Sequence, residues 1–150
     1  MGIVVVDTNV WMAASGLTEQ ADPPCATACL DALERLRDAD TLALDAQRQI
    51  ENEYFDNLPR QSFSHMLLGE LLASGRIEFK ACDWSSEGIA LVPPTLADLD
   101  PSDHKFAAVA LTYDPPAPIY NAVDTDWCEC AAGLAAAGLE VIELCPQCLR

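Results

Sequence analysis

The sequence is poor in positive charge. Its 150 residues include 8 Lys and Arg against 24 Asp and Glu, which gives a net charge of −16 at pH 7. Such a field repels nucleic acid at long range and favours cationic partners or metal ions, and it is also compatible with life at high salt. A nucleic-acid function would therefore depend on bound cations and a few basic side chains. The candidates, each of which we interpret first as a solvated surface charge, are Arg48, Arg60, Arg76 and Lys105.

Long apolar runs and histidines are scarce as well. No run approaches membrane length and the first residues lack the basic stretch of a signal peptide, so we expect a soluble, cytoplasmic protein with no membrane partner. With 51% hydrophobic residues, the chain should form a single domain over residues 1–150. The two histidines, His65 and His104, are too few for histidine-based ribonuclease chemistry, and His104 is expected to be an exposed residue in the first turn of a helix.

The cysteine count is odd. The seven are Cys25, Cys29, Cys82, Cys128, Cys130, Cys145 and Cys148. An odd number in a cytoplasmic chain argues against a disulfide framework and favours reduced thiols, some of them buried. The alternative is a zinc site built from Cys128, Cys130, Cys145 and Cys148, because a two-residue gap lets the second pair face one ion.

The chain opens with an apolar run that ends in an acid. Ile3 to Val6 shows no polar alternation, which is typical of a central strand in a parallel sheet. Asp7 follows at the end of that strand, where ligands collect in open α/β sheets, and Thr8 and Asn9 can orient it. The alternative is that Asp7 only caps a helix beginning near Val10.

Strand and helix patterns alternate along the rest of the sequence. Helices are predicted at about 25–39, 45–58, 61–74, 101–113 and 127–137, and strands at 41–44, 118–123 and 140–144. Between residues 76 and 95, the pattern leaves open whether the strand is Ile77–Lys80 or Leu91–Val92. The alternation predicts an α/β fold with a parallel sheet and right-handed crossovers.

Two further acidic positions stand at the starts of predicted helices. Asp100 is expected to cap a helix with Pro101 at its first position. Asp103 either only completes a capping box with Asp100 or begins the stripe that would bury this helix. Asp124 follows an apolar segment, and Asp126 is expected to be the cap of the next helix. A carboxylate that points inward needs a partner, and a cation shared with Asp7 would supply one.

The sequence resembles the PIN-domain ribonucleases over essentially its whole length. The matching motifs, in the same order and spacing, are Val-Val-Asp-Thr-Asn-Val at 5–10, Ile-Glu-Asn-Glu-Tyr at 50–54, Asp-His-Lys-Phe-Ala-Ala-Val-Ala at 103–110 and Asn-Ala-Val-Asp-Thr-Asp-Trp at 121–127. The resemblance implies a Rossmann-like three-layer fold, with helices on both faces of the parallel sheet. The opening motif is its most specific part.

The resemblance also implies a site for Mg²⁺ or Mn²⁺. Its acids would be Asp7, Glu53, Asp103 and Asp124, with Asp126 as a nearby metal ligand. Glu53 is chosen because it directly precedes Tyr54, and helical spacing leaves Glu51 as the alternative. Where the family often has Thr or Ser, this chain has Ala122, so the hydrogen bond of that side chain is either missing or supplied by Thr125.

The expected function is metal-dependent endonucleolytic cleavage of RNA. Oxygen ligands select Mg²⁺ or Mn²⁺ rather than zinc. The resemblance suggests the toxin of a toxin–antitoxin pair, with RNA as substrate and a basic antitoxin or a second copy of the chain as partner. The alternatives are a PIN-fold scaffold or RNA-binding protein without catalysis and, least favoured, a metal-dependent phosphatase. The phosphatases with an aspartate nucleophile carry a second Asp where this sequence has Asn9.

Overall fold

The structure is a computed structural model that describes residues 2–149. Its centre is a five-stranded parallel sheet with the order β3-β2-β1-β4-β5. The strands are β1 (Ile3–Val6), β2 (Thr41–Asp45), β3 (Ile77–Lys80), β4 (Ile119–Asn121) and β5 (Val141–Glu143). The predicted fold class, a parallel sheet between helices, is therefore confirmed.

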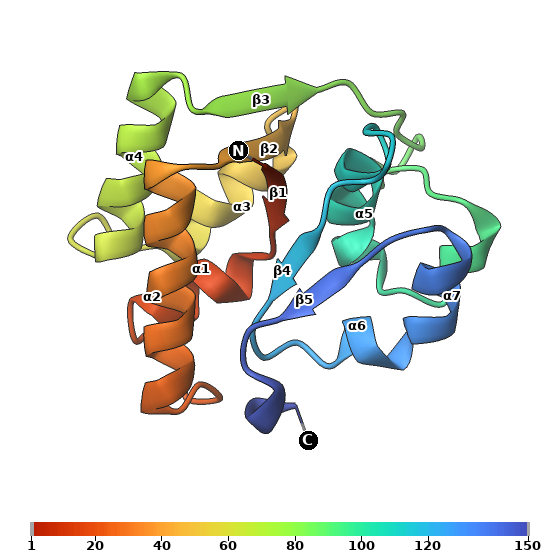
Figure 1. The fold of residues 1–150 in the computed structure, drawn as a ribbon. Helices are drawn as coiled ribbons and strands as arrows, with labels where there is room; N and C mark the ends of the chain where they lie inside the picture. Colours follow the sequence, from red (N-terminus) through yellow and green to blue (C-terminus); the bar gives the residue numbers. More distant parts are fainter. Residues whose placement is uncertain (1, 150) are drawn as a thin grey trace.

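Helices cover both faces of this sheet. Figure 1 shows α2 and α4 on one side of the strands and α5 and α7 on the other. The helices are α1 (Thr8–Ala14), α2 (Pro23–Asp38), α3 (Gln49–Asn57), α4 (Phe63–Ser74), α5 (His104–Ala110), α6 (Asp126–Glu129) and α7 (Ala131–Ala136), and the short 3₁₀ helices are η1 (Pro94–Leu96), η2 (Pro101–Asp103) and η3 (Pro146–Cys148). None of the helices in residues 2–149 has the length and apolar character needed to cross a membrane.

The strand order places a topological switch point beside β1. The chain adds β2 and β3 on one side of β1 and then returns to add β4 and β5 on the other side. Val4 pairs with Leu42 of β2, and Val5 pairs with Ile119 of β4. Ligand sites of open α/β sheets lie beyond the carboxyl ends of the strands at such a point. The segments that follow β1 and β4 therefore frame the expected site.

The structure settles the strand that the sequence left open. Ile77–Lys80 is β3 and pairs with β2, whereas Leu91–Val92 belongs to no strand. The helix predicted over 45–58 begins only at Gln49, because the buried Asp45 carboxylate accepts hydrogen bonds from the backbone of Gln49 and Ile50. A turn with Arg48 at a φ of 64° therefore precedes the helix.

The helix predicted over 127–137 is two helices, α6 and α7, separated at Cys130. After this break α7 approaches η1 so closely that a Cβ on Gly133 would stand 2.1 Å from the carbonyl oxygen of Thr95. Only glycine permits that contact. The redirected α7 therefore packs against η1.

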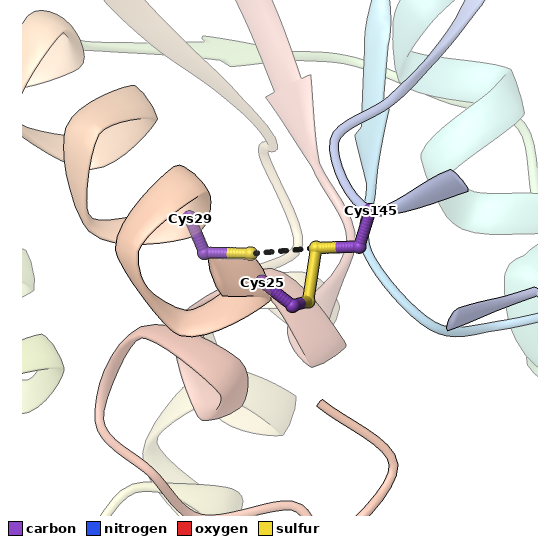
Figure 2. A group of neighbouring side chains, drawn as sticks. All are labelled: Cys25, Cys29 and Cys145. Atoms are coloured by element: carbon purple, nitrogen blue, oxygen red, sulfur yellow. Dashed lines mark hydrogen bonds between the residues drawn. A yellow bond between two sulfur atoms is a disulfide. The ribbon is translucent and has the colours of Figure 1, made fainter. Parts of the chain in front are cut away.

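The prediction that all cysteines are reduced is wrong for two of them. A disulfide joins Cys25 of α2 to Cys145, just after β5 (Figure 2). The alternative zinc set is not gathered either, since Cys128 is exposed, Cys130 is buried elsewhere and Cys145 is in the disulfide. Folding brings together two cysteines that are 120 positions apart, and cysteine spacing alone does not reveal such a pair.

Candidate metal centre

Asp7 is at the carboxyl end of β1 and is only 5% exposed. Its Oδ1 accepts a hydrogen bond from the backbone N–H of Asn9 at 3.3 Å, which makes it the N-cap of α1. Its Oδ2 accepts from the indole Nε1 of Trp127 at 2.7 Å. The sequence leaves open whether Asp7 caps a helix or faces inward. In the structure it does both, because Oδ1 caps α1 and Oδ2 accepts from the buried Trp127.

Asn9 connects the ends of β1 and β4. Its Nδ2 donates to Oδ1 of Asn121, and its Oδ1 accepts from the backbone N–H groups of Ala122 and Val123 at 2.9 and 3.0 Å. Asn121, completely buried, donates in turn to the backbone carbonyl oxygen of Asp124 at 2.8 Å. These bonds fix the loop that carries Asp124 against the end of β1.

Asp103 reaches the same region from η2. Asp100 caps that turn by accepting from the backbone N–H of Ser102 at 2.9 Å, as the sequence predicts. Asp103 is 6% exposed, and its Oδ2 is buried without a hydrogen-bond donor among the described residues. A buried carboxylate oxygen with no donor is costly, and a cation would relieve that cost.

The carboxylates of Asp7, Asp103 and Asp124 converge, and each offers an oxygen within 4.8 Å of the other two. Asp124 Oδ1 accepts from the backbone N–H of Asp126 at 2.9 Å, while Asp126 is the first residue of α6. The prediction that Asp126 is the cap is therefore wrong, because the side chain that receives the helix N–H belongs to Asp124. Asp126 is half-buried beside the cluster and is not one of its three members.

Burial and mutual repulsion oppose ionisation of this acidic trio. Burial raises the pKa of Asp7 from 3.8 to about 6; Asp124 adds to the rise, and the hydrogen bond from Trp127 opposes it. Burial, reinforced by the charges of Asp7 and Asp124, raises the pKa of Asp103 to about 8. Burial also raises the pKa of Asp124. A divalent cation between the three carboxylates would reverse these shifts.

Glu53 faces the trio from α3. Its Oε2 accepts from the hydroxyl of Thr8, and its Oε1 pairs with Nζ of Lys105 at 2.9 Å. Glu51 instead pairs with Arg48 at 3.0 Å. The geometry therefore favours Glu53 over Glu51 as the fourth acid. Lys105, whose side chain is only 12% exposed, is not the solvated surface charge that we expected.

A cavity of about 560 Å³ opens over these acids. Its lining residues are Asp7, Thr8, Asn9, Met12, Gln20, Glu53, Asn57, Val123, Asp124, Thr125 and Cys148. Asp103, the third member of the trio, is not part of this lining. The lining contains no lysine or arginine, within the part of the chain that is described. An anionic ligand in the cavity would need a cation to accompany it.

Sequence reasoning missed two side chains that organise the site. Trp127 is completely buried and supplies the indole donor to Asp7, and Asn121 anchors the β4 loop. Both lie within the motif at 121–127, but only packing reveals their partners.

His104 was expected to be exposed. It is half-buried, with its Nε2 2.8 Å from the carbonyl oxygen of Leu99, because the 3₁₀ turn before α5 folds it back onto that backbone.

Comparisons with known proteins identify no relative. No family model, no curated protein and no solved structure matches the chain. The features that bear on function are the acidic trio, Glu53 and their place at the switch point of the sheet.

Proposed function

We propose that the chain is a metal-dependent endoribonuclease with a PIN-like fold. The observation that carries the proposal is the convergence of the Asp7, Asp103 and Asp124 carboxylates within 4.8 Å of one another. They meet at the switch point between β1 and β4, where open α/β sheets bind ligands. Enzymes that hydrolyse phosphate esters commonly use such clusters of oxygen ligands.

The residues present fit a hard divalent cation. Three carboxylates offer oxygen ligands, and the Oδ2 of Asp103 has no donor among the described residues. Oxygen-only ligand sets select Mg²⁺ or Mn²⁺ over zinc. Asp7, Asp103 and Asp124 would hold the ion, with Glu53 and Asp126 nearby. When bound, the ion supplies Lewis-acid chemistry and lowers the pKa of water in the site.

The protein's own side chains divide the remaining work. Trp127 fixes the orientation of Asp7, and the Asn9–Asn121 pair fixes the loop of Asp124. Glu53 is held at the cavity wall by Thr8 and Lys105 and is not a member of the trio. Glu53 would act as the general base: an attacking water would give its proton to Oε1 or Oε2 of this carboxylate.

The charge of the chain defines how RNA would bind. A net charge of −16 and a cavity lining without lysine or arginine leave few direct phosphate contacts among residues 2–149. RNA binding should then depend on divalent cations more than on basic side chains. The same acidic surface suits a basic protein partner, in keeping with a cytoplasmic toxin that an antitoxin neutralises, and the site is built within one chain whether or not two copies associate.

The phosphatase alternative is disfavoured by the position of Asn9. Its side chain makes three hydrogen bonds that hold the β4 loop, so it is not available at the place where those enzymes have their second aspartate. A catalytically inactive scaffold would keep the same fold. It would have no need of an acid such as Asp103, whose unpaired oxygen costs stability in the absence of a cation.

An RNA cleavage assay tests the proposed function. Purified wild-type protein should cut single-stranded RNA internally in Mn²⁺ or Mg²⁺ and lose that activity in EDTA. Asp103→Asn, which removes one member of the trio, should be inactive under the same conditions. A control variant, Glu51→Gln, changes the neighbouring acid that pairs with Arg48 and should retain activity. Cleavage that persists in EDTA, or in Asp103→Asn, would contradict the proposal.

A further inference from the structure

A second cluster of potential metal ligands lies where the C-terminal segment meets the start of α2. Cys25 and Cys29 are one turn apart on α2, and both are completely buried. Cys145 directly precedes the short helix η3, and Cys148 is the last residue of that helix. Cys25, Cys29 and Cys145 have their sulfur atoms within 4.8 Å of one another, and Cys25 belongs to a second such group with Cys148 and the exposed Asp22. Figure 2 shows the sulfur of Cys29 directed at that of Cys145.

One pair of sulfur atoms in the cluster has the spacing of a tetrahedral thiolate site. The Sγ atoms of Cys29 and Cys145 are 3.8 Å apart. In a tetrahedral zinc site each Zn–S bond is about 2.3 Å, so the edge between two sulfur atoms is about 3.8 Å. The Cys-x₃-Cys spacing places two thiols on one face of a helix, and the Cys-x₂-Cys spacing places two on one side of a turn.

We infer that Cys25, Cys29, Cys145 and Cys148 bind one zinc ion as four thiolates when the Cys25–Cys145 disulfide is reduced. A dithiol reductant donates two electrons and two protons: the S–S bond breaks, Cys25 and Cys145 become thiols, and the reductant becomes a disulfide. Zinc then replaces the four thiol protons, which pass to solvent. The disulfide and the zinc site are alternative states of one cluster.

The surroundings of the cluster favour a soft cation. Three of the four sulfur ligands, those of Cys25, Cys29 and Cys145, are completely buried. Thiolate ligands select zinc over Mg²⁺ and Mn²⁺, so this cluster and the acidic trio would take different ions. Cys148 is half-buried and gives the ion a path from solvent.

A zinc ion there would also fix one wall of the acidic cavity. Cys148 lines that cavity together with Asp7 and Asp124. The disulfide holds the C-terminal segment only through Cys145, whereas zinc would hold Cys148 as well. The zinc site is inferred from the positions of the cysteines alone and does not depend on the proposed nuclease activity.

Cobalt substitution tests the inference on the full-length protein. Wild-type protein, stripped with EDTA and reduced without oxygen, should bind one Co²⁺ per chain at the cysteine cluster, with intense thiolate-to-metal charge-transfer absorption and the visible bands of a tetrahedral site. Zinc should displace it. Absence of these bands in the reduced protein would overturn the inference. Cobalt on the acidic trio would have oxygen ligands and no charge-transfer band, so Asp103→Asn should leave the signal unchanged, and a band that needs Asp103 would also overturn it.

Variants with one cysteine replaced by serine test the ligand set. Cys29→Ser should weaken cobalt binding at least about tenfold, because a four-thiolate site loses one ligand. The variant keeps both partners of the disulfide, so its folding can be checked by thermal melting of the oxidised form. Cys128→Ser, which changes an exposed thiol outside the cluster, should bind cobalt as the wild type does. Wild-type affinity in Cys29→Ser, or an equal loss in Cys128→Ser, would contradict the assignment.

Discussion

The indole Nε1 of Trp127 donates a hydrogen bond to Oδ2 of Asp7 at 2.7 Å, across 120 positions of sequence. The donor is completely buried, and it opposes the rise that burial causes in the pKa of Asp7. This contact couples the packing of α6 to the charge at the end of β1. The integrity of the acidic site therefore depends on a residue that is not itself an acid.

Trp127→Phe should destabilise the protein and weaken its metal binding at neutral pH. Loss of a hydrogen bond to a charged group costs about 1–3 kcal/mol, and the pKa of Asp7 should rise further. Trp11→Phe is the matched control, because Trp11 is equally buried and donates to none of the trio in the described structure. Thermal melts and Mn²⁺ titrations across pH measure both effects. A Trp11→Phe variant with the same shift in metal binding would show that packing alone is responsible.

Asp103→Asn and Asp7→Asn should differ in stability although both remove a trio carboxylate. Asp103 has an oxygen with no donor, so its neutral replacement relieves repulsion and should leave the metal-free protein equally or more stable. Asp7 accepts hydrogen bonds through both oxygens. An asparagine there presents an amide N–H₂ to one of those donors and should cost stability, on the order of 1–3 kcal/mol. Chemical denaturation in EDTA compares them, and a large loss in Asp103→Asn would mean that this acid is a structural partner.

Without metal, the protein should become less stable as the pH rises from about 4 to about 8. The folded-state pKa values of Asp7 and Asp103 are raised, so the stability that these groups contribute is fully present below their unfolded value of 3.8 and is lost as the pH passes through about 6 and about 8. For Asp7 the loss is on the order of 3 kcal/mol. Melting temperatures in EDTA across this range measure the trend. Mn²⁺ should flatten it, and a pH-independent melt in EDTA would argue against buried, mutually repelling acids.

The fold could be predicted from local patterns, because parallel strands and their flanking helices follow from apolar runs and helix start signals. Ile3–Val6 and the acid that follows it are one example, and Asp100 with Pro101 at the start of η2 is another. Strand ends in a parallel sheet share one edge, which is why Asp7 and Asp124 could be expected near each other.

The contacts that sequence reasoning missed join side chains far apart in the chain. The Trp127–Asp7 bond and the Cys25–Cys145 disulfide each span 120 positions, and Lys105 meets Glu53 only because α5 packs against α3. Such pairs depend on the exact rotation of each helix, which periodicity specifies poorly. The same limit applies to Asp126, which the sequence predicts as a cap although it is the first residue of α6 and donates its backbone N–H to Asp124.

Metal should raise the melting temperature of the wild type, and Asp124→Asn should reduce this gain more than Asp126→Asn. A ligand that binds only the folded state stabilises it by mass action. Asp124 belongs to the trio and Asp126 does not. The helix start survives in Asp124→Asn, because asparagine also accepts the backbone N–H of Asp126. Differential scanning with and without Mn²⁺ measures the gain, and equal reductions would move Asp126 into the ligand set.

RNA binding by the wild type should depend on divalent metal and only weakly on monovalent salt. With 8 Lys and Arg in 150 residues, few phosphate contacts form, so the slope of log affinity against log salt should be shallow. In 0.1 M salt, interactions between exposed charges more than about 10 Å apart are screened. Added salt would therefore mainly reduce the long-range repulsion between RNA and the acidic surface. The measurement is RNA affinity against KCl at fixed Mn²⁺ and again in EDTA. Asp103→Asn in Mn²⁺ is the control and should behave like the wild type in EDTA. Tight, steeply salt-dependent binding that survives EDTA would reveal a basic RNA surface and favour a scaffold over a nuclease.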